Sequence, residues 1–250
     1  MKYDKFEFDP YTLPDVRVTD NYNFPHHFRS AWDDFTKNIP VWENRLKEFK
    51  GKSDLTFLEL GTAQGRATVW LLEEILTEEN CKILTVDNKI EQIATCNGNS
   101  LLNFFYENIE KDNLGEEYID LKNQEWWPHR ENAEIRYNVI NNLKPYIDNN
   151  KCDFYNENTS NFFKSLATAI GLKPVFDFIY VDASHNPENV IFDAVNSFRY
   201  LKTGGVMIFD DYAWGDCKIG IDSFLNTHKS YYTDLIVDTQ VTIRKSKDLE

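Results

Sequence analysis

Hydrophobic positions along the 250-residue chain fall into short apolar runs that alternate with stretches of helical periodicity. The run 175–181 is almost continuously apolar, as in a parallel strand that is buried on both faces. The alternation predicts an α/β fold, a doubly wound, Rossmann-like, seven-stranded sheet with an antiparallel C-terminal strand. Strands are predicted at 56–60, 82–86, 151–155, 175–181, 206–209, 234–237 and 240–245, and helices after Gly65 and at 88–110, 133–142, 161–170, 187–198 and 219–228.

The N-terminal residues depart from this alternation. Residues 1–50 are predicted to form an arm and a helical cap ahead of one main domain at 51–250. The helical pattern of 26–49, broken at Pro40, carries aromatic side chains. They either seal the end of the sheet, the favoured interpretation, or form a lid over a substrate pocket. His26 and His27 are expected at the surface.

A second departure is the long segment 88–130, between the second and third predicted strands. A segment of this length in a compact α/β fold predicts an insertion or a lid. Its Trp126–Trp127 pair either covers a substrate or anchors the insertion.

The charge of the chain narrows the choice of partners. A net charge of −14 argues against nucleic acid or an anionic membrane surface as the main partner. The sequence has no apolar run long enough to span a membrane and no signal peptide, so a cytoplasmic location is expected. Its four cysteines have no paired spacing, which favours reduced thiols over disulfides or a zinc site.

The stretch from Glu59 to Thr68 joins the first predicted strand to its helix through a glycine loop. Gly61 and Gly65 allow a tight turn and the close approach of a ligand to backbone N–H groups, and the helix N-terminus suits an anionic group. Asp87 ends the second strand, about 20 residues further on, where such folds hold a ribose. These features predict an adenosine-containing ligand. The alternatives are glycines that serve packing alone and an Asp87 that caps a helix.

Acidic residues follow several predicted strands. Asp182, Asp210 and Asp211 come at the ends of the fourth and fifth strands, which we expect to be neighbours. Three carboxylates at one point repel unless a cation joins them or their pKa values rise. Oxygen ligands suit Mg²⁺, with Ca²⁺ or Mn²⁺ as substitutes. Alternatively, Asp182 contacts a cofactor while Asp210 and Asp211 cap the next segment.

These motifs together resemble the class I S-adenosylmethionine-dependent methyltransferases. The resemblance covers about 55–245 and is closest to the small-molecule O-methyltransferases that include the catechol and macrolide-sugar enzymes. It rests on Glu59-Leu60-Gly61-Thr62-Ala63-Gln64-Gly65, Asp87, Phe178 to His185, and Gly204 to Tyr212.

The resemblance implies a role for each matching position. Asp182, Asp210 and Asp211 would bind the metal, Mg²⁺ or else Ca²⁺ or Mn²⁺, and His185 stands where catechol-type enzymes carry a catalytic lysine. Asp182 and His185 are therefore the predicted catalytic residues. Thr68 would replace a serine hydroxyl that is absent at Ala67. The residues predicted to bind S-adenosylmethionine are Glu59, Gly61, Thr62, Ala63, Gly65, Thr68, Asp87, Asn158, Thr159, Ser160 and Asp182. Among them, Asn158, Thr159 and Ser160 would flank the adenine, or else they cap the helix that follows.

The reaction expected is O-methylation of a small-molecule hydroxyl, with N-methylation as an alternative. Methyl transfer from a sulfonium mainly requires that the nucleophile be held close and in line. His185 would accept the proton. The alternative is that His185 faces solvent at the start of a helix and has no role in the reaction. The acceptor is expected to be a neutral or cationic small molecule, and a homodimer is left open as the assembly.

Two rival functions are considered, a nicotinamide-dependent oxidoreductase and a cofactor-binding module without activity. The first has a Tyr118–Lys122 pair at the spacing of a catalytic dyad, but the pair lies between the wrong strands. The second shares every binding motif and differs only in lacking turnover.

Overall fold

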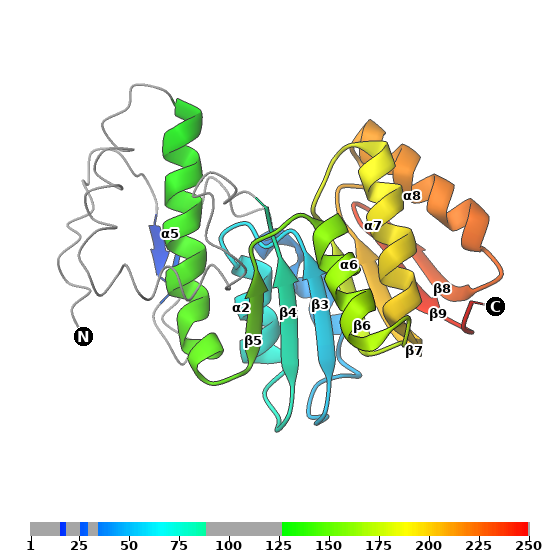
Figure 1. Cartoon of the computed structure of the whole chain (residues 1–250), viewed down its shortest axis with the longest axis horizontal. Helices are drawn as coiled ribbons and strands as arrows, with labels where there is room; N and C mark the ends of the chain where they lie inside the picture. The colour runs from blue at the N-terminus through cyan, green and yellow to red at the C-terminus, as the bar shows by residue number, and fades with distance from the viewer. Residues whose placement is uncertain (1–15, 19–25, 30–34, 89–126, 250) are drawn as a thin grey trace.

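The computed structural model describes residues 16–18, 26–29, 35–88 and 127–249, and its main body is a seven-stranded sheet flanked by helices (Figure 1). The strands lie in the order β5-β4-β3-β6-β7-β9-β8. The elements of this body are β3 (Thr56–Leu60), α2 (Arg66–Glu74), β4 (Lys82–Val86), α5 (Trp127–Asp148), β5 (Cys152–Tyr155), α6 (Thr159–Ile170), β6 (Phe176–Val181), α7 (Pro187–Tyr200), β7 (Leu201–Phe209), α8 (Gly215–His228), β8 (Tyr232–Val237) and β9 (Val241–Lys245).

The sheet is parallel except for β9, which runs antiparallel to both β7 and β8. From β3 the chain proceeds outward through β4 and β5, then returns to place β6 on the other side of β3. The carboxyl ends of β3 and β6 thus flank the point where the strand order reverses, which is where open α/β sheets bind ligands. The predicted fold class is confirmed.

Each face of the sheet has its own hydrophobic core, because successive side chains of a strand point to opposite faces. Phe57, Phe178 and Tyr180 face the core that includes α2 and α5. Leu58 and Ile179 face the core that includes α6, α7 and α8. Helices therefore cover both faces, and the strand tips are left to form a site.

The N-terminal residues differ from the prediction. A short strand, β2 (His27–Arg29), pairs with β1 (Val16–Val18) where a helix was expected. After the 3₁₀ turn η2 (Thr36–Asn38), α1 (Ile39–Arg45) begins, and Pro40 lies in its first turn. Pro40 starts this helix rather than breaking it, because the first turn needs no proline N–H.

His26 corrects a second expectation. It is fully buried rather than at the surface, and its Nε2 lies 2.9 Å from the Tyr146 hydroxyl oxygen. The imidazole also stacks on the rings of Phe28 and Tyr146, at 5.8 and 5.7 Å between centroids. The aromatic contacts and the hydrogen bond to Tyr146 offset the free-energy cost of burying this polar ring. The side chain of His27 lies outside the described residues.

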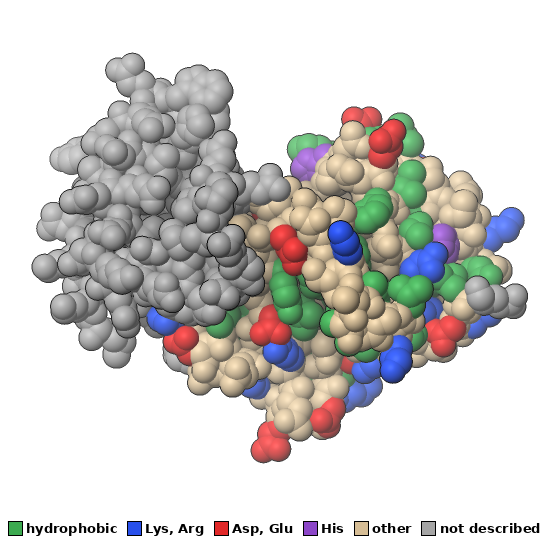
Figure 2. Space-filling view, in the orientation of Figure 1, with side chains coloured by type: hydrophobic (Ala, Val, Ile, Leu, Met, Phe, Trp, Pro, Cys, Tyr) green, Lys and Arg blue, Asp and Glu red, His purple; other side chains and the backbone are tan. Residues whose placement is uncertain are grey.

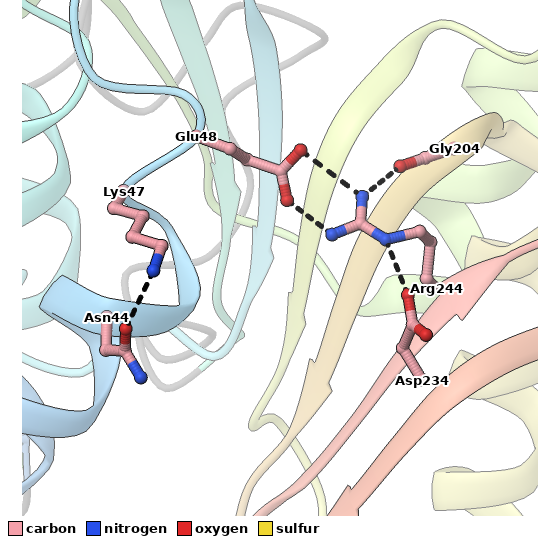
Figure 3. A network of polar contacts seen from close by, with 6 residues as sticks. All are labelled: Asn44, Lys47, Glu48, Gly204, Asp234 and Arg244. Atoms are coloured by element: carbon pink, nitrogen blue, oxygen red, sulfur yellow. Dashed lines mark hydrogen bonds and ion pairs between the residues drawn. The ribbon is translucent and has the colours of Figure 1, made fainter.

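Helix α1 packs on the sheet face through Trp42, whose ring meets those of Phe178 and Tyr180 edge-on at 5.6 and 4.7 Å. The described aromatic side chains of this segment, Phe28, Phe35, Trp42 and Phe49, thus belong to the core on this face of the sheet. The residues after α1 are also tied to β9, because Arg244 binds Glu48 as well as Asp234 and the Gly204 carbonyl oxygen (Figure 3).

Several predictions fall outside the described residues. They concern one aromatic side chain of the 26–49 segment (Trp32), one of the four cysteines (Cys96), Trp126, the Tyr118–Lys122 pair and most of the 88–130 segment. The boundary at residue 50 and the insertion stay predictions. No described helix has the length and apolar character needed to cross a membrane.

Candidate active site

The loop from β3 to α2 turns through three residues with positive φ, namely Gly61 (94°), Ala63 (46°) and Gly65 (81°). Gly61 lies where this loop passes the end of β6. A Cβ on Gly61 would overlap the carbonyl oxygen of Asp182 and lie 2.9 Å from the Ala183 Cα. The absence of a side chain at Gly61 therefore lets the two strand ends meet at the switch point.

Asp87 lies at the tip of β4 and is brought to the same loop. The backbone N–H of Ala63 donates a hydrogen bond of 2.8 Å to Asp87 Oδ2, and Asp87 is 8% exposed. The predicted ribose-binding acid and the glycine loop therefore lie side by side, as expected when two neighbouring parallel strands end at the same edge of the sheet.

Glu59 and Thr68 lie beneath the loop, where both are buried. The hydroxyls of Thr68 and Thr85 donate hydrogen bonds to Glu59 Oε2, at 2.6 Å for Thr85. Thr62 and Thr85 share a further hydroxyl contact of 2.5 Å. Burial raises the pKa of Glu59 from 4.5 to about 7, against the opposing effect of the two hydroxyl donors. This network fixes the loop from below, and direct contact of Glu59 or Thr68 with a cofactor stays a prediction.

Glu59→Gln is expected to make unfolding less dependent on pH. Because the native carboxyl holds its proton more tightly than the unfolded one, native stability falls as pH rises from about 4.5 to about 7, by about 3 kcal/mol in total. The variant removes this loss, so its unfolding midpoint relative to wild type should increase between about pH 5 and about pH 8.

Thermal unfolding at the two pH values measures the effect. Glu74→Gln, at an exposed ion pair with Lys50, is the control and should leave the pH dependence unchanged. Parallel pH curves for Glu59→Gln and wild type would contradict the assignment.

The turn between β5 and α6 carries the residues predicted to flank an adenine. Asn158 is the N-cap of α6, and its Oδ1 accepts hydrogen bonds from the Asn161 N–H at 2.9 Å and the Ser160 hydroxyl at 2.6 Å. The helix-cap alternative thus holds for Asn158. Contact of Asn158, Thr159 or Ser160 with adenine stays a prediction.

Two of the acidic residues after β6 and β7, Asp182 and Asp210, meet around one tyrosine, whereas the Asp211 carboxylate contacts His185. The Tyr180 hydroxyl donates to Asp182 Oδ2 at 3.1 Å and also contacts Asp210 Oδ2. Asp210 Oδ1 accepts the Asp211 N–H at 2.8 Å. Burial, followed by the nearby carboxylates of Asp210 and Asp211, raises the pKa of Asp182 well above its ordinary value. The expected convergence of β6 and β7 therefore produces mutual carboxylate repulsion.

A buried chain of hydrogen bonds reaches this site from α1. The Trp42 indole N–H donates to Gln240 Oε1 at 2.8 Å, and Gln240 Nε2 donates to Asp210 Oδ1 at 3.2 Å. Tyr180 and Gln240 are site residues that were not predicted from the sequence. Tyr180 was detectable, since it precedes Asp182 by two positions and so shares its strand face, whereas no local pattern marks Gln240.

His185 lies across from the carboxylates in the loop after β6. Its Nε2 is 2.8 Å from Asp211 Oδ2, and its ring is 4.6 Å from that of Trp214. His185 directly precedes Asn186, the N-cap of α7, and its side chain is 49% exposed, which the solvent-facing alternative also expects. A small cavity lies between the strand ends and is lined by residues that include Asp182, Ser184, His185, Asp210, Asp211 and Cys217.

This fold and site define a class I methyltransferase. A glycine loop joined to Asp87 lies beside a cluster of carboxylates with a histidine, at the tips of neighbouring strands. A family model described as a methyltransferase domain matches residues 58–212. The chain belongs to this methyltransferase family, and the predicted resemblance to S-adenosylmethionine-dependent enzymes is confirmed.

Solved structures share the fold at low sequence identity. A protein proposed to be an rRNA methylase from Clostridium thermocellum has a TM-score of 0.52 at 15% identity, covering 84% of this chain and 97% of its own. An O-methyltransferase from Bacillus cereus, in complex with SAH, has a TM-score of 0.51 at 14% identity, with 94% and 86% covered. The MycE methyltransferase of mycinamycin biosynthesis, with Mg, SAH and mycinamycin VI, has a TM-score of 0.51 at 12% identity, with 88% and 51% covered. A search of curated proteins finds no match.

Proposed function

We propose that the enzyme transfers the methyl group of S-adenosylmethionine to a hydroxyl oxygen of a small molecule, with a divalent cation held by Asp182, Asp210 and Asp211. The observation that carries the proposal is the meeting of two half-sites at the switch point. Asp87 and the glycine loop form one half, and the carboxylates with His185 form the other. Gly61, packed on the Asp182 backbone, lies between them.

The donor half suits an S-adenosyl group. Asp87, at the tip of β4, would accept hydrogen bonds from the ribose hydroxyls, and the N-terminus of α2 would attract the donor's carboxylate. O-methyltransferase and MycE structures with SAH bound share this fold, which supports the choice of donor.

The donor set of the acceptor half fits a hard divalent cation. Asp182, Asp210 and Asp211 offer carboxylate oxygens whose mutual repulsion a cation such as Mg²⁺ would relieve. A cation at this point would lower the pKa of an acceptor hydroxyl. The MycE structure, which contains Mg, supports the idea by likeness of fold.

The chain's own residues would orient the acceptor and move one proton. His185 Nδ1 is the proposed proton acceptor, because Nε2 donates its hydrogen to Asp211 Oδ2 at 2.8 Å, and this contact orients the ring. The proton leaves the acceptor oxygen as that oxygen forms a bond to the methyl carbon and the methyl–sulfur bond breaks. Alignment of the two half-sites is the main source of rate.

A small molecule fits the electrostatics better than RNA does. The chain carries a net charge of −14. Acidic and basic side chains are interspersed on the described part of the face in Figure 2, without a continuous basic stripe. A polynucleotide backbone needs such a stripe.

The proposal is tested by calorimetry with SAH, followed by labelled methyl transfer to a panel of phenols, catechols and glycosides with and without Mg²⁺. We expect SAH binding and incorporation of label into an oxygen. Absence of SAH binding would overturn the proposal for the donor, and incorporation into nitrogen would overturn the proposal for the acceptor.

Asp87→Ala is expected to weaken SAH binding by about 10- to 150-fold, since it removes charge-assisted hydrogen bonds worth about 1.5–3 kcal/mol. Titration calorimetry measures the change. Asp153→Ala removes a neighbouring acid on β5 that pairs with Lys82 at the surface, and it should bind SAH like wild type. Equal affinities for Asp87→Ala and Asp153→Ala would contradict the ribose assignment.

A further inference from the structure

Cys217, near the start of α8, faces the acidic cavity although no sequence motif marks it. It is 2% exposed and is a free thiol. One ligand atom from each of His185, Asp211 and Cys217 lies within 4.8 Å of the other two. The described part of the chain contains one such group of three potential metal ligands.

The three side chains come from separate parts of the chain. His185 follows β6, Asp211 follows β7 and Cys217 lies in α8, so the fold and not a local motif assembles them. The described residues form no hydrogen bond to the Cys217 thiol. His185 is about half exposed, which gives an ion access from solvent to the buried thiol.

We propose that His185, Asp211 and Cys217 form a binding site for a thiophilic divalent cation, with Zn²⁺ as the favoured ion. Imidazole, carboxylate and thiolate are the ligand types that proteins use for zinc, and three protein ligands with one water complete a tetrahedron. A thiolate among the ligands discriminates against Mg²⁺, which prefers oxygen.

The geometry needs only a small adjustment. Zinc bonds of about 2.0 Å to nitrogen or oxygen and about 2.3 Å to sulfur put neighbouring ligand atoms roughly 3.3–3.5 Å apart in a tetrahedron. The His185–Asp211 contact of 2.8 Å would open by about half an ångström, and the ligand atoms now spread over as much as 4.8 Å would close.

The surrounding charge favours a cation. Asp182 and Asp210 line the same cavity as Asp211 and Cys217, so their carboxylates add negative potential at the site. A bound cation would stabilise the thiolate and release its proton. Because Asp211 and His185 also serve the proposed reaction, zinc at this site would compete with it.

Titration with Co²⁺, which replaces zinc and reports thiolate ligation by a near-ultraviolet charge-transfer band, tests the site on the full chain. We expect one equivalent to give the band in wild type. Cys217→Ser should lose it, with Zn²⁺ affinity reduced about tenfold or more, and His185→Gln should weaken Zn²⁺ binding comparably. Cys152→Ser, at a buried thiol in β5, should retain both the band and the affinity.

A band that survives in Cys217→Ser, or Zn²⁺ affinity equal to wild type in both Cys217→Ser and His185→Gln, would overturn the proposal. The measurement uses neither methyl donor nor acceptor. Its result is therefore independent of SAH binding and of methyl transfer, which test the proposed function.

Discussion

Replacing Gly61 with alanine is expected to destabilise the native fold by about 3 kcal/mol or more and to abolish measurable SAH binding. The added Cβ would overlap the Asp182 carbonyl oxygen, and that atom belongs to backbone held by the hydrogen bond from Asp182 N–H to the Leu60 carbonyl. The φ of 94° adds strain for any L side chain. Relief would require β3 and β6 to separate at the switch point.

Thermal unfolding should show a midpoint lower by roughly 6–12 °C, at about 2–4 °C per kcal/mol for a chain of this size. Gly51→Ala is the matched control, because Gly51 has a φ of 77° but no atom within 4 Å of an added Cβ. The control should be destabilised only by the smaller effect of backbone strain. A Gly61→Ala protein as stable as Gly51→Ala would mean that the two strand ends are not in contact.

Asp182→Asn should lower methyl transfer roughly a hundredfold or more, because the site loses a charge that would hold the cation over the acceptor oxygen. The fold should tolerate the change. Asparagine keeps the size of the side chain and an oxygen that accepts the Tyr180 hydroxyl, and its neutrality removes repulsion from Asp210 and Asp211.

Two measurements separate function from folding. Without metal, Asp182→Asn should unfold at or above the wild-type midpoint. Mg²⁺ should raise the midpoint of wild type but not that of Asp182→Asn. Asp216→Asn, at an exposed acid in the first turn of α8, is the control and should keep the response to Mg²⁺. An Asp182→Asn protein that responds to Mg²⁺ like wild type would remove Asp182 from the metal site.

The central sheet could be predicted because β6 and the end of β7 are nearly continuous apolar runs, a pattern that indicates burial on both faces, and the other strands are short apolar-rich runs between helical patterns. Strand β4 occurs at the predicted residues, 82–86. The prediction of β7 was less accurate. The strand starts at Leu201 and passes through Gly204 and Gly205, whose local sequence is typical of a turn. A register shift opposite β6 accommodates these glycines.

The acids of the site could be predicted for the same reason. Strand tips in a parallel sheet lie at one edge, so Asp87, Asp182 and Asp210 follow from strand ends and neighbour order alone. Gln240 and Cys217 could not be found this way, because their contacts depend on how β9 and α8 pack in three dimensions. His26 was misplaced because its partner, Tyr146, is 120 residues away.

The placement of α1 against β9 has a consequence for biosynthesis. Trp42, Arg45 and Glu48 are translated early, yet their partners Gln240, Asp238 and Arg244 follow nearly two hundred positions later. On the ribosome, Trp42 can pack on β6 as soon as Phe178 and Tyr180 have emerged, but the polar contacts of α1 and Glu48 have to wait for residues 238–244. The polar closure of this side of the sheet is therefore expected to be a late step in folding, because it joins segments far apart in the sequence.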